Sequence, residues 1–295
     1  MEPTLNYHLG PGLDISDEAR YKPCQVLSAH QVPHVVWFED ALFHYGVPTV
    51  VFDLYILVTD INQAASLLAE AGWTFDMQPP HRIGNEKVDL TVFPQQRLIS
   101  PNRETRVVLL PPADWKFSLT PTTPLEHASL KNDIYTVPFP SLAGLLDALI
   151  ESWLDCPNES LLIGLACHIS YLYEYVPAVK ERSFAENMKY EHRQFHADVL
   201  SGMETGTLPF RRHQRAIRDA LVKGQYELQE CSASPETHRE LYSIWSERAL
   251  KSDGEEQEKV DALTSAETGP DARGLSLLLF LCFCFVMIWL FAPHL

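Results

Sequence analysis

The chain has few cysteines and few basic residues for its length. Six cysteines are spread over 295 residues, and no two of them have the Cys-x-x-Cys spacing of a zinc or redox site. The pattern predicts reduced thiols in a cytosolic protein rather than a disulfide framework. Lysine and arginine number 23 against 39 aspartates and glutamates, which gives a formal charge of −16. Because such a surface repels phosphate backbones, nucleic acid is not expected as a partner.

The motifs of several common enzyme classes are also missing. The sequence has no glycine-rich phosphate loop, no Gly-x-Ser-x-Gly nucleophile motif and no protein-kinase signature. Residues 1–20 lack the basic cluster and the apolar stretch of a signal peptide. The composition is that of a folded protein, with 46% hydrophobic and 11% aromatic residues. Any chemistry must therefore come from less common patterns.

One long apolar stretch is present, at residues 275–292, and it contains no charged side chain. Eighteen helical residues span about 27 Å, close to the ~30 Å hydrocarbon core of a bilayer. We expect a single-pass transmembrane helix that contacts membrane lipid, with the rest of the protein on the cytosolic side. The sequon at Asn158 tests this topology, because it would be glycosylated only in a lumenal protein.

The remaining sequence predicts an α+β fold followed by helices. Alternation and capping signals predict strands at 50–58, 87–93 and 106–110 and helices at 39–45, 63–71, 142–154, 159–175, 182–200, 212–230 and 235–251. We therefore expect a small mixed sheet with flanking helices, then an α-helical lobe. The predicted parts are an extended N-terminal arm (1–30), the α+β lobe (31–140), the helical lobe (141–251), an acidic flexible spacer (252–273) and the transmembrane helix.

The segment 38–55, FEDALFHYGVPTVVFDLY, carries the most informative pattern. It predicts a short helix that contains Ala41 and Leu42, a stop at Gly46, and a buried strand that contains Asp53. With these residues at these spacings, the segment resembles the first motif of the nucleotidyltransferase superfamily, which has the polymerase-β-like fold. The resemblance implies a nucleotidyltransferase-like fold for the α+β lobe.

The resemblance also implies a metal site. In the family, this strand displays two carboxylates at positions i and i+2, which point to the same side and together hold divalent metal with a nucleotide. Asp53 takes the first position and is the implied catalytic and metal-binding residue. Asp89 is the candidate for the third carboxylate, contributed by a neighbouring strand. The implied cofactor of an active enzyme is Mg²⁺ with a nucleotide.

Two positions depart from the family pattern. Tyr55 stands at the second carboxylate position, and a phenol is a poor Mg²⁺ ligand at neutral pH. Phe38 and Glu39 stand where the family has a glycine pair that allows close backbone approach to phosphate. Glu39 and Asp40 are candidate replacement carboxylates, with Tyr55, for ligand binding. Their more usual role is favourable charge at a helix N-terminus.

Three functions are compatible with these patterns. The favoured hypothesis is a membrane-tethered, nucleotidyltransferase-like protein that is non-catalytic and acts by binding a ligand or a protein. The first alternative is an active, metal-dependent nucleotidyltransferase that modifies a small molecule or a protein through Asp53 and Asp89. The second alternative is a membrane scaffold that recruits a partner through the helical lobe, for which an exposed apolar patch is expected.

Two further clusters have simpler interpretations. His192 and His196 lie at i and i+4 beside Glu191, as in some zinc sites, but the His-Glu-x-x-His order is absent. A solvated face of a charged helix is the expected setting. The basic cluster Arg211, Arg212, Arg215 and Arg218 predicts the polar side of an amphipathic helix, with anionic lipid or the acidic spacer as possible contacts.

Overall fold

The computed structural model describes residues 17–77, 82–83, 86–87, 93–129, 135–156, 158–203 and 205–233. All of them belong to the first of two compact units of the chain, Met1–His238. The predicted spacer, the predicted transmembrane helix at 275–292 and Asp89 lie outside the described residues, so these stay predictions. In the described part, no helix is both long and apolar enough to cross a membrane.

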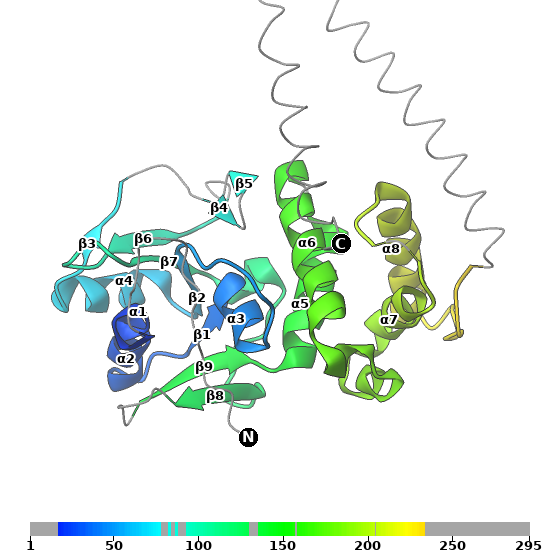
Figure 1. Ribbon diagram of the computed structural model, residues 1–295, viewed down its shortest axis with the longest axis horizontal. Coiled ribbons are helices and arrows are strands. Elements are labelled where there is room, and N and C mark those ends of the chain that lie inside the picture. The colour runs from blue at the N-terminus through cyan, green and yellow to red at the C-terminus, as the bar shows by residue number, and fades with distance from the viewer. Residues whose placement is uncertain are drawn as a thin grey trace, which may run out of the picture. The chain divides into compact units, whose positions relative to one another are not determined.

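A five-stranded mixed sheet forms the centre of the first half of the chain (Figure 1). Its order is β1 (His34–Trp37), β2 (Leu54–Val58), β7 (Arg106–Leu110), β6 (Gln96–Ile99) and β3 (Thr74–Phe75). β2 runs parallel to β7, and the other neighbours are antiparallel. All five residues of β2 are buried, as the apolar run predicts for a central strand. The small mixed sheet and its helices confirm the predicted α+β fold class.

Among the described residues, helices and two hairpins accompany this sheet. The hairpins pair β4 (Arg82–Ile83) with β5 (Glu86–Lys87) and β8 (Leu125–Ser129) with β9 (Thr136–Pro140). The helices that precede residue 141 are α1 (Asp17–Arg20), α2 (Lys22–Ala29), α3 (Glu39–His44), α4 (Ile61–Glu70) and the 3₁₀ turn η1 (Pro112–Trp115). Residues 17–29, expected within an extended arm, are thus largely helical, because Tyr21, Cys24 and Leu27 are buried in the core.

The second half of the described chain is helical. It contains α5 (Leu142–Asp155), α6 (Glu159–Tyr175), η2 (Pro177–Lys180), η3 (Arg182–Asn187), η4 (Tyr190–His192), α7 (Arg193–Leu200) and α8 (Leu208–Val222). α5 packs against α6, α8 and η1, and α6 also contacts α3. In Figure 1, α5 and α6 lie side by side between the sheet and the pair α7 and α8. A continuous hydrophobic core joins the sheet to these helices.

Several predicted elements occur where local capping chemistry places them. Ser141 caps α5 by accepting a hydrogen bond from the Gly144 amide. Asp60 caps α4 in the same way, and Gly72 ends it with φ of +94°. The predictions for α6 and β7 are confirmed with the same bounds.

Other predicted bounds are wrong because tertiary contacts override the local pattern. The predicted strand 50–58 starts only at Leu54, after an irregular segment in which Val50 is exposed. The predicted helix 182–200 is broken into η3, η4 and α7, and the Lys189 amide at the break donates to Asp147 Oδ2 at 2.9 Å. The predicted helix 212–230 is α8, which starts earlier, at a Thr207 cap, and ends before Gly224.

Candidate functional site

The structure brings together Glu39, Asp40, Asp53 and Tyr55, four of the five residues predicted for the site. Glu39 and Asp40 open α3 directly after β1, while Tyr55 lies in β2 opposite Trp37 of β1. The charges of Glu39, Asp53 and Asp40 all act on the Tyr55 hydroxyl. The fifth residue, Asp89, lies outside the described residues. The segment 38–55 therefore gathers its acidic groups at one end of β2.

Asp40 is an internal structural anchor. Its side chain is fully buried, and the Arg20 guanidinium donates to its two oxygens at 2.6 and 2.7 Å. The Tyr21 hydroxyl donates to the same carboxylate at 3.0 Å, and Arg20 also donates to the Phe52 carbonyl. A bidentate pair of this kind satisfies both charges inside the protein. Through these bonds the carboxylate of Asp40 links α1 and α2 to α3.

Glu39 is fully buried as well, and it faces the helical part of the chain. Its Oε1 lies 3.9 Å from Nε2 of His168 on α6. Burial lowers the pKa of His168 to about 4, so this imidazole is neutral at pH 7. The contact is therefore a polar junction between α3 and α6, and neither group is accessible to solvent.

Asp53 and Tyr55 are also removed from solvent. Asp53 is 8% exposed and Tyr55 is 1% exposed. Burial raises the pKa of the Tyr55 hydroxyl, and the negative charges of Glu39 and Asp53 raise it further. The phenol is therefore neutral at pH 7 and cannot replace a carboxylate as a metal ligand. In the described part of the chain, no group of three or more His, Cys, Asp or Glu side chains is arranged to hold a metal ion.

The prediction of a solvated face for His192 and His196 is wrong. His192 is fully buried, with Nδ1 2.8 Å from Asp147 Oδ1 and Nε2 2.6 Å from Glu151 Oε2. Although burial alone would lower the pKa of His192, the hydrogen bonds and charges of these two carboxylates raise it. His196 is buried one turn along and bonds to the Tyr173 hydroxyl through Nδ1 at 3.0 Å.

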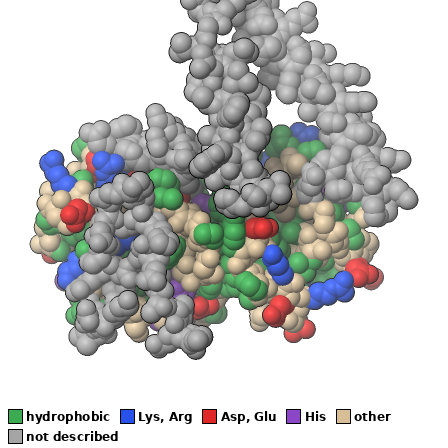
Figure 2. Space-filling view, in the orientation of Figure 1, with side chains coloured by type: hydrophobic (Ala, Val, Ile, Leu, Met, Phe, Trp, Pro, Cys, Tyr) green, Lys and Arg blue, Asp and Glu red, His purple; other side chains and the backbone are tan. Residues whose placement is uncertain are grey.

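The basic cluster of α8 bonds to α5. Arg218 pairs with Glu151 and Asp155, and Arg215 pairs with Asp155. Arg211 donates to the Trp153 and Cys156 carbonyls, which end α5. The face seen in Figure 2 has acidic and basic side chains interspersed over the helical part of the chain. Arg211, Arg215 and Arg218 therefore hold α8 against α5, and the predicted contact with lipid or with the acidic spacer stays a prediction.

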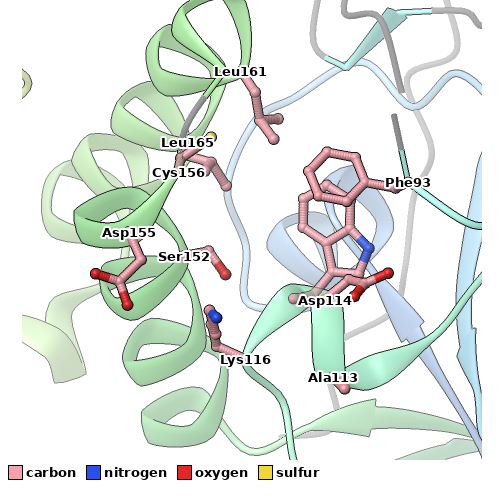
Figure 3. Close-up of a pocket in the computed structure, with 10 residues that line it drawn as sticks. Phe93, Ala113, Asp114, Lys116, Ser152, Asp155, Cys156, Leu161 and Leu165 are labelled. Atoms are coloured by element: carbon pink, nitrogen blue, oxygen red, sulfur yellow. The ribbon is translucent and has the colours of Figure 1, made fainter. Parts of the chain in front are cut away.

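A pocket of about 180 Å³ lies between η1 and the helices α5 and α6 (Figure 3). Apolar and aromatic walls come from Phe93, Trp115, Leu161 and Leu165. Ser152 and Asp155 of α5 and Asp114 of η1 are among the polar residues of the lining. Sequence reasoning missed this site, because its residues come from four separate segments and have no common spacing.

Comparison with known proteins gives little further information. No protein-family model matches the chain, and no curated protein matches it. Among solved structures, the chain is similar to JHP933 from Helicobacter pylori at 12% sequence identity and a TM-score of 0.34, over 85% of this chain and 100% of that one. A similarity of this size carries no argument about fold family or activity.

Proposed function

We propose that the chain is a non-catalytic, nucleotidyltransferase-like protein, tethered to a membrane at the cytosolic side, that acts by binding a ligand or a protein. The observation that supports this most is the burial of the acidic groups. Asp40 is bonded to Arg20 and Tyr21, Glu39 is fully buried against His168, and Tyr55 stands as a neutral phenol at the second carboxylate position. Divalent metal with a nucleotide needs accessible carboxylate oxygens.

The backbone at Phe38 supports the resemblance to the family. Phe38 has φ of +53° and ψ of −128°, in a region that glycine occupies easily and that a bulky residue rarely adopts. It stands where the family has a glycine pair. Its ring is buried, and its centroid is 4.7 Å from that of Trp115. A glycine-like backbone that carries a buried aromatic ring fits a nucleotidyltransferase framework whose phosphate-binding turn has been filled.

Calorimetric titration of the full chain with ATP, in the presence of Mg²⁺ or Mn²⁺, tests this proposal. We expect no saturable binding heat up to millimolar ATP. An Asp53→Asn variant serves as the matched control. Metal-dependent ATP binding by the natural chain that is lost in Asp53→Asn would contradict the proposal and favour the active transferase, with Asp53 and Asp89 as ligands.

One observation favours the scaffold as a second candidate. Ile163, Tyr171 and Tyr175 lie along α6 at multiples of four residues, and each is more than 40% exposed. Apolar groups grouped in this way are typical of interaction surfaces. If the protein recruits a partner through this face, replacement of all three by glutamate should abolish a defined cross-linked species in cells. Persistence of that species would rule out the face.

A further inference from the structure

The last described segment of the chain, residues 225–233, follows α8 and contains no helix or strand. We call this segment the strap, and hydrogen bonds hold it beside α7 (Figure 1). Gly224, with φ of +67° and open space around it, forms the turn that separates the strap from α8. Residues 225 and 227–230 are exposed, so little apolar burial holds this part of the strap.

Three polar side chains on one face of α7 and its C-terminal cap bind the strap. They are Gln194, Asp198 and Ser201, at positions i, i+4 and i+7, and we call them the α7 surface. Gln194 bonds to both main-chain groups of Gln229, because its Oε1 accepts from the amide at 2.7 Å and its Nε2 donates to the carbonyl at 3.1 Å. The Ser201 hydroxyl donates to the Glu230 carbonyl at 3.0 Å. Since every residue has a carbonyl and all but proline have an amide, these bonds recognise a peptide main chain rather than particular side chains.

Asp198 recognises one residue of the strap through its side chain as well. Its Oδ1 accepts from the Ser232 amide at 2.7 Å, and its Oδ2 accepts from the Ser232 hydroxyl. Because a carboxylate only accepts, the hydroxyl donates, and Nε2 of His213, 2.7 Å away, donates to Ser232 Oγ in turn. Asp198 is fully buried and also accepts from Gln194 of α7 and Gln214 of α8. Both helices therefore hold this carboxylate in place, where it selects a residue with a hydroxyl group.

The neighbours of Ser232 set the rest of the specificity. Cys231 and Ala233 are partly buried and pack against the hydrophobic core. Glu230 pairs with Arg182 at 3.0 Å, but both side chains are more than three-quarters exposed, so this pair contributes little. The α7 surface therefore fits a peptide with a serine between two small apolar residues.

We propose that the α7 surface is a peptide-binding site for another protein and that the strap occupies it as a built-in competitor. The partner segment carries a serine between two small apolar residues and is bound mainly through its main chain. A segment joined to the body by a short turn acts at an effective concentration on the order of millimolar. A partner at lower concentration therefore binds only when the strap is released. The inference deepens the proposed binding role and rests on it for biological meaning.

A release variant of the full chain tests the inference. Gln229→Pro removes the amide that donates to Gln194. Ser232→Ala removes the hydroxyl that donates to Asp198, and the α7 surface itself stays unchanged. The probe is a fluorescently labelled peptide with the sequence of residues 226–233. Fluorescence anisotropy should show saturable binding to the release variant, at least about tenfold tighter than to the natural chain.

Matched peptides and one further variant test how the α7 surface recognises its partner. A peptide with Ser232→Ala should bind about tenfold or more weakly, because it lacks a hydrogen bond to a carboxylate. A peptide with Glu230→Ala should bind within about threefold of the natural peptide, because α7 is bonded to the carbonyl of that residue. Asp198→Asn, added to the release variant, should weaken binding about tenfold or more. Absence of saturable binding to a folded release variant, or equal binding of the Ser232→Ala peptide, would overturn the inference.

The natural chain supplies an independent measurement if the release variant does not fold. Unlabelled peptide at about 10 mM, well above the effective concentration of the strap, should displace the strap. Amide hydrogen exchange of residues 225–233 should then become faster, while exchange in α8 stays unchanged. Exchange in the strap that does not respond to the peptide would overturn the inference.

This inference and the proposed function can fail separately. Metal-dependent ATP binding would contradict the proposed function without affecting peptide binding. Failure of peptide binding would leave the absence of ATP binding unchanged.

Discussion

Replacement of the buried His192 by glutamine is expected to destabilise the fold, and to do so more at low pH than at high pH. Both ring nitrogens of His192 bond to carboxylate oxygens, at 2.8 Å to Asp147 and at 2.6 Å to Glu151. Because an ionised carboxylate only accepts, both nitrogens donate, and the imidazole is protonated. Removal of one partner from a buried ion pair costs about 3–5 kcal/mol, which is the loss we expect at pH 5.5.

The sign of the pH dependence follows from the direction of the pKa shift. The pKa of His192 is raised in the folded state, so its contribution to stability is complete below the unfolded-state pKa of about 6.5. That contribution is lost as the pH rises through the folded-state pKa. Each tenfold difference in proton affinity between the folded and unfolded states is worth about 1.4 kcal/mol. The groups that face the ring are Asp147 and Glu151 of α5, and Arg218 of α8 is bonded to Glu151.

Glu151 sets the lower pH limit of the stabilisation by this network. Partial burial acts to raise the pKa of Glu151, but the hydrogen bond from His192 and the charges of His192 and Arg218 lower it overall. Its contribution is therefore present above its unfolded-state pKa of about 4.3 and is lost as the pH falls through the folded-state value. The network stabilises the fold most between about pH 4.5 and 6.5.

The assay is urea unfolding of the natural chain and of His192→Gln at pH 5.5 and 8.5. Fluorescence of the buried Trp153, on α5 beside the network, is one reporter. The unfolding free energies of the two proteins are subtracted because other buried histidines also destabilise the fold at low pH. Burial lowers the pKa of His34, His44, His168 and His196. A difference in unfolding free energy that is equal at both pH values would refute a protonated His192.

Three further predictions concern the fold and topology. Asp40→Asn should lower the free energy of unfolding by about 3–5 kcal/mol, because it leaves the buried Arg20 without its carboxylate. In urea titration, the double variant Asp40→Asn with Arg20→Met should recover part of this loss, and a purely additive loss would contradict the pairing. Gly72→Ala should lower the melting temperature through a backbone cost of about 1–2 kcal/mol, because φ is +94° and the nearest atom to an added Cβ is 3.6 Å away; an unchanged melting temperature would contradict this. Asn158 should carry no glycan in cells, and a mobility shift on deglycosylation would contradict a cytosolic body.

The elements that the sequence predicts well are those that local chemistry determines. α5 has its own Ser141 cap, and α4 lies between the Asp60 cap and Gly72. β7 is a short, largely apolar run whose bounds agree with the prediction. In each case the residues that define the ends lie within a few positions of the ends themselves, so a single sequence contains the necessary information.

The environment of the charged groups depends on contacts that are distant in sequence. His192 and the α8 arginines are typical of solvated helical faces, yet they bond to Asp147, Glu151 and Asp155 on α5, more than 40 residues away. One signal was available: three acids four residues apart on an otherwise apolar helix indicate a buried, ion-paired face. Asp40 shows the same limitation, because its partner Arg20 lies in the segment expected to be an extended arm.

The sequence predicted which segment forms the candidate site, but not how its side chains are buried. The pattern of residues 38–55 brings Glu39, Asp53 and Tyr55 together, but their burial depends on packing from other segments of the chain. For Glu39, one such contact comes from α6, through His168. The pocket at Trp115 and Ser152 had no sequence signal, because it exists only where η1 meets α5.

The most direct test of the central claim is a transfer assay with nucleotide labelled at the α-phosphate. The full chain, supplied with Mn²⁺, labelled ATP and a cell extract as a source of acceptors, should give no more labelled product than the Asp53→Ala variant. Labelled product that the natural chain forms and Asp53→Ala does not would contradict a non-catalytic role.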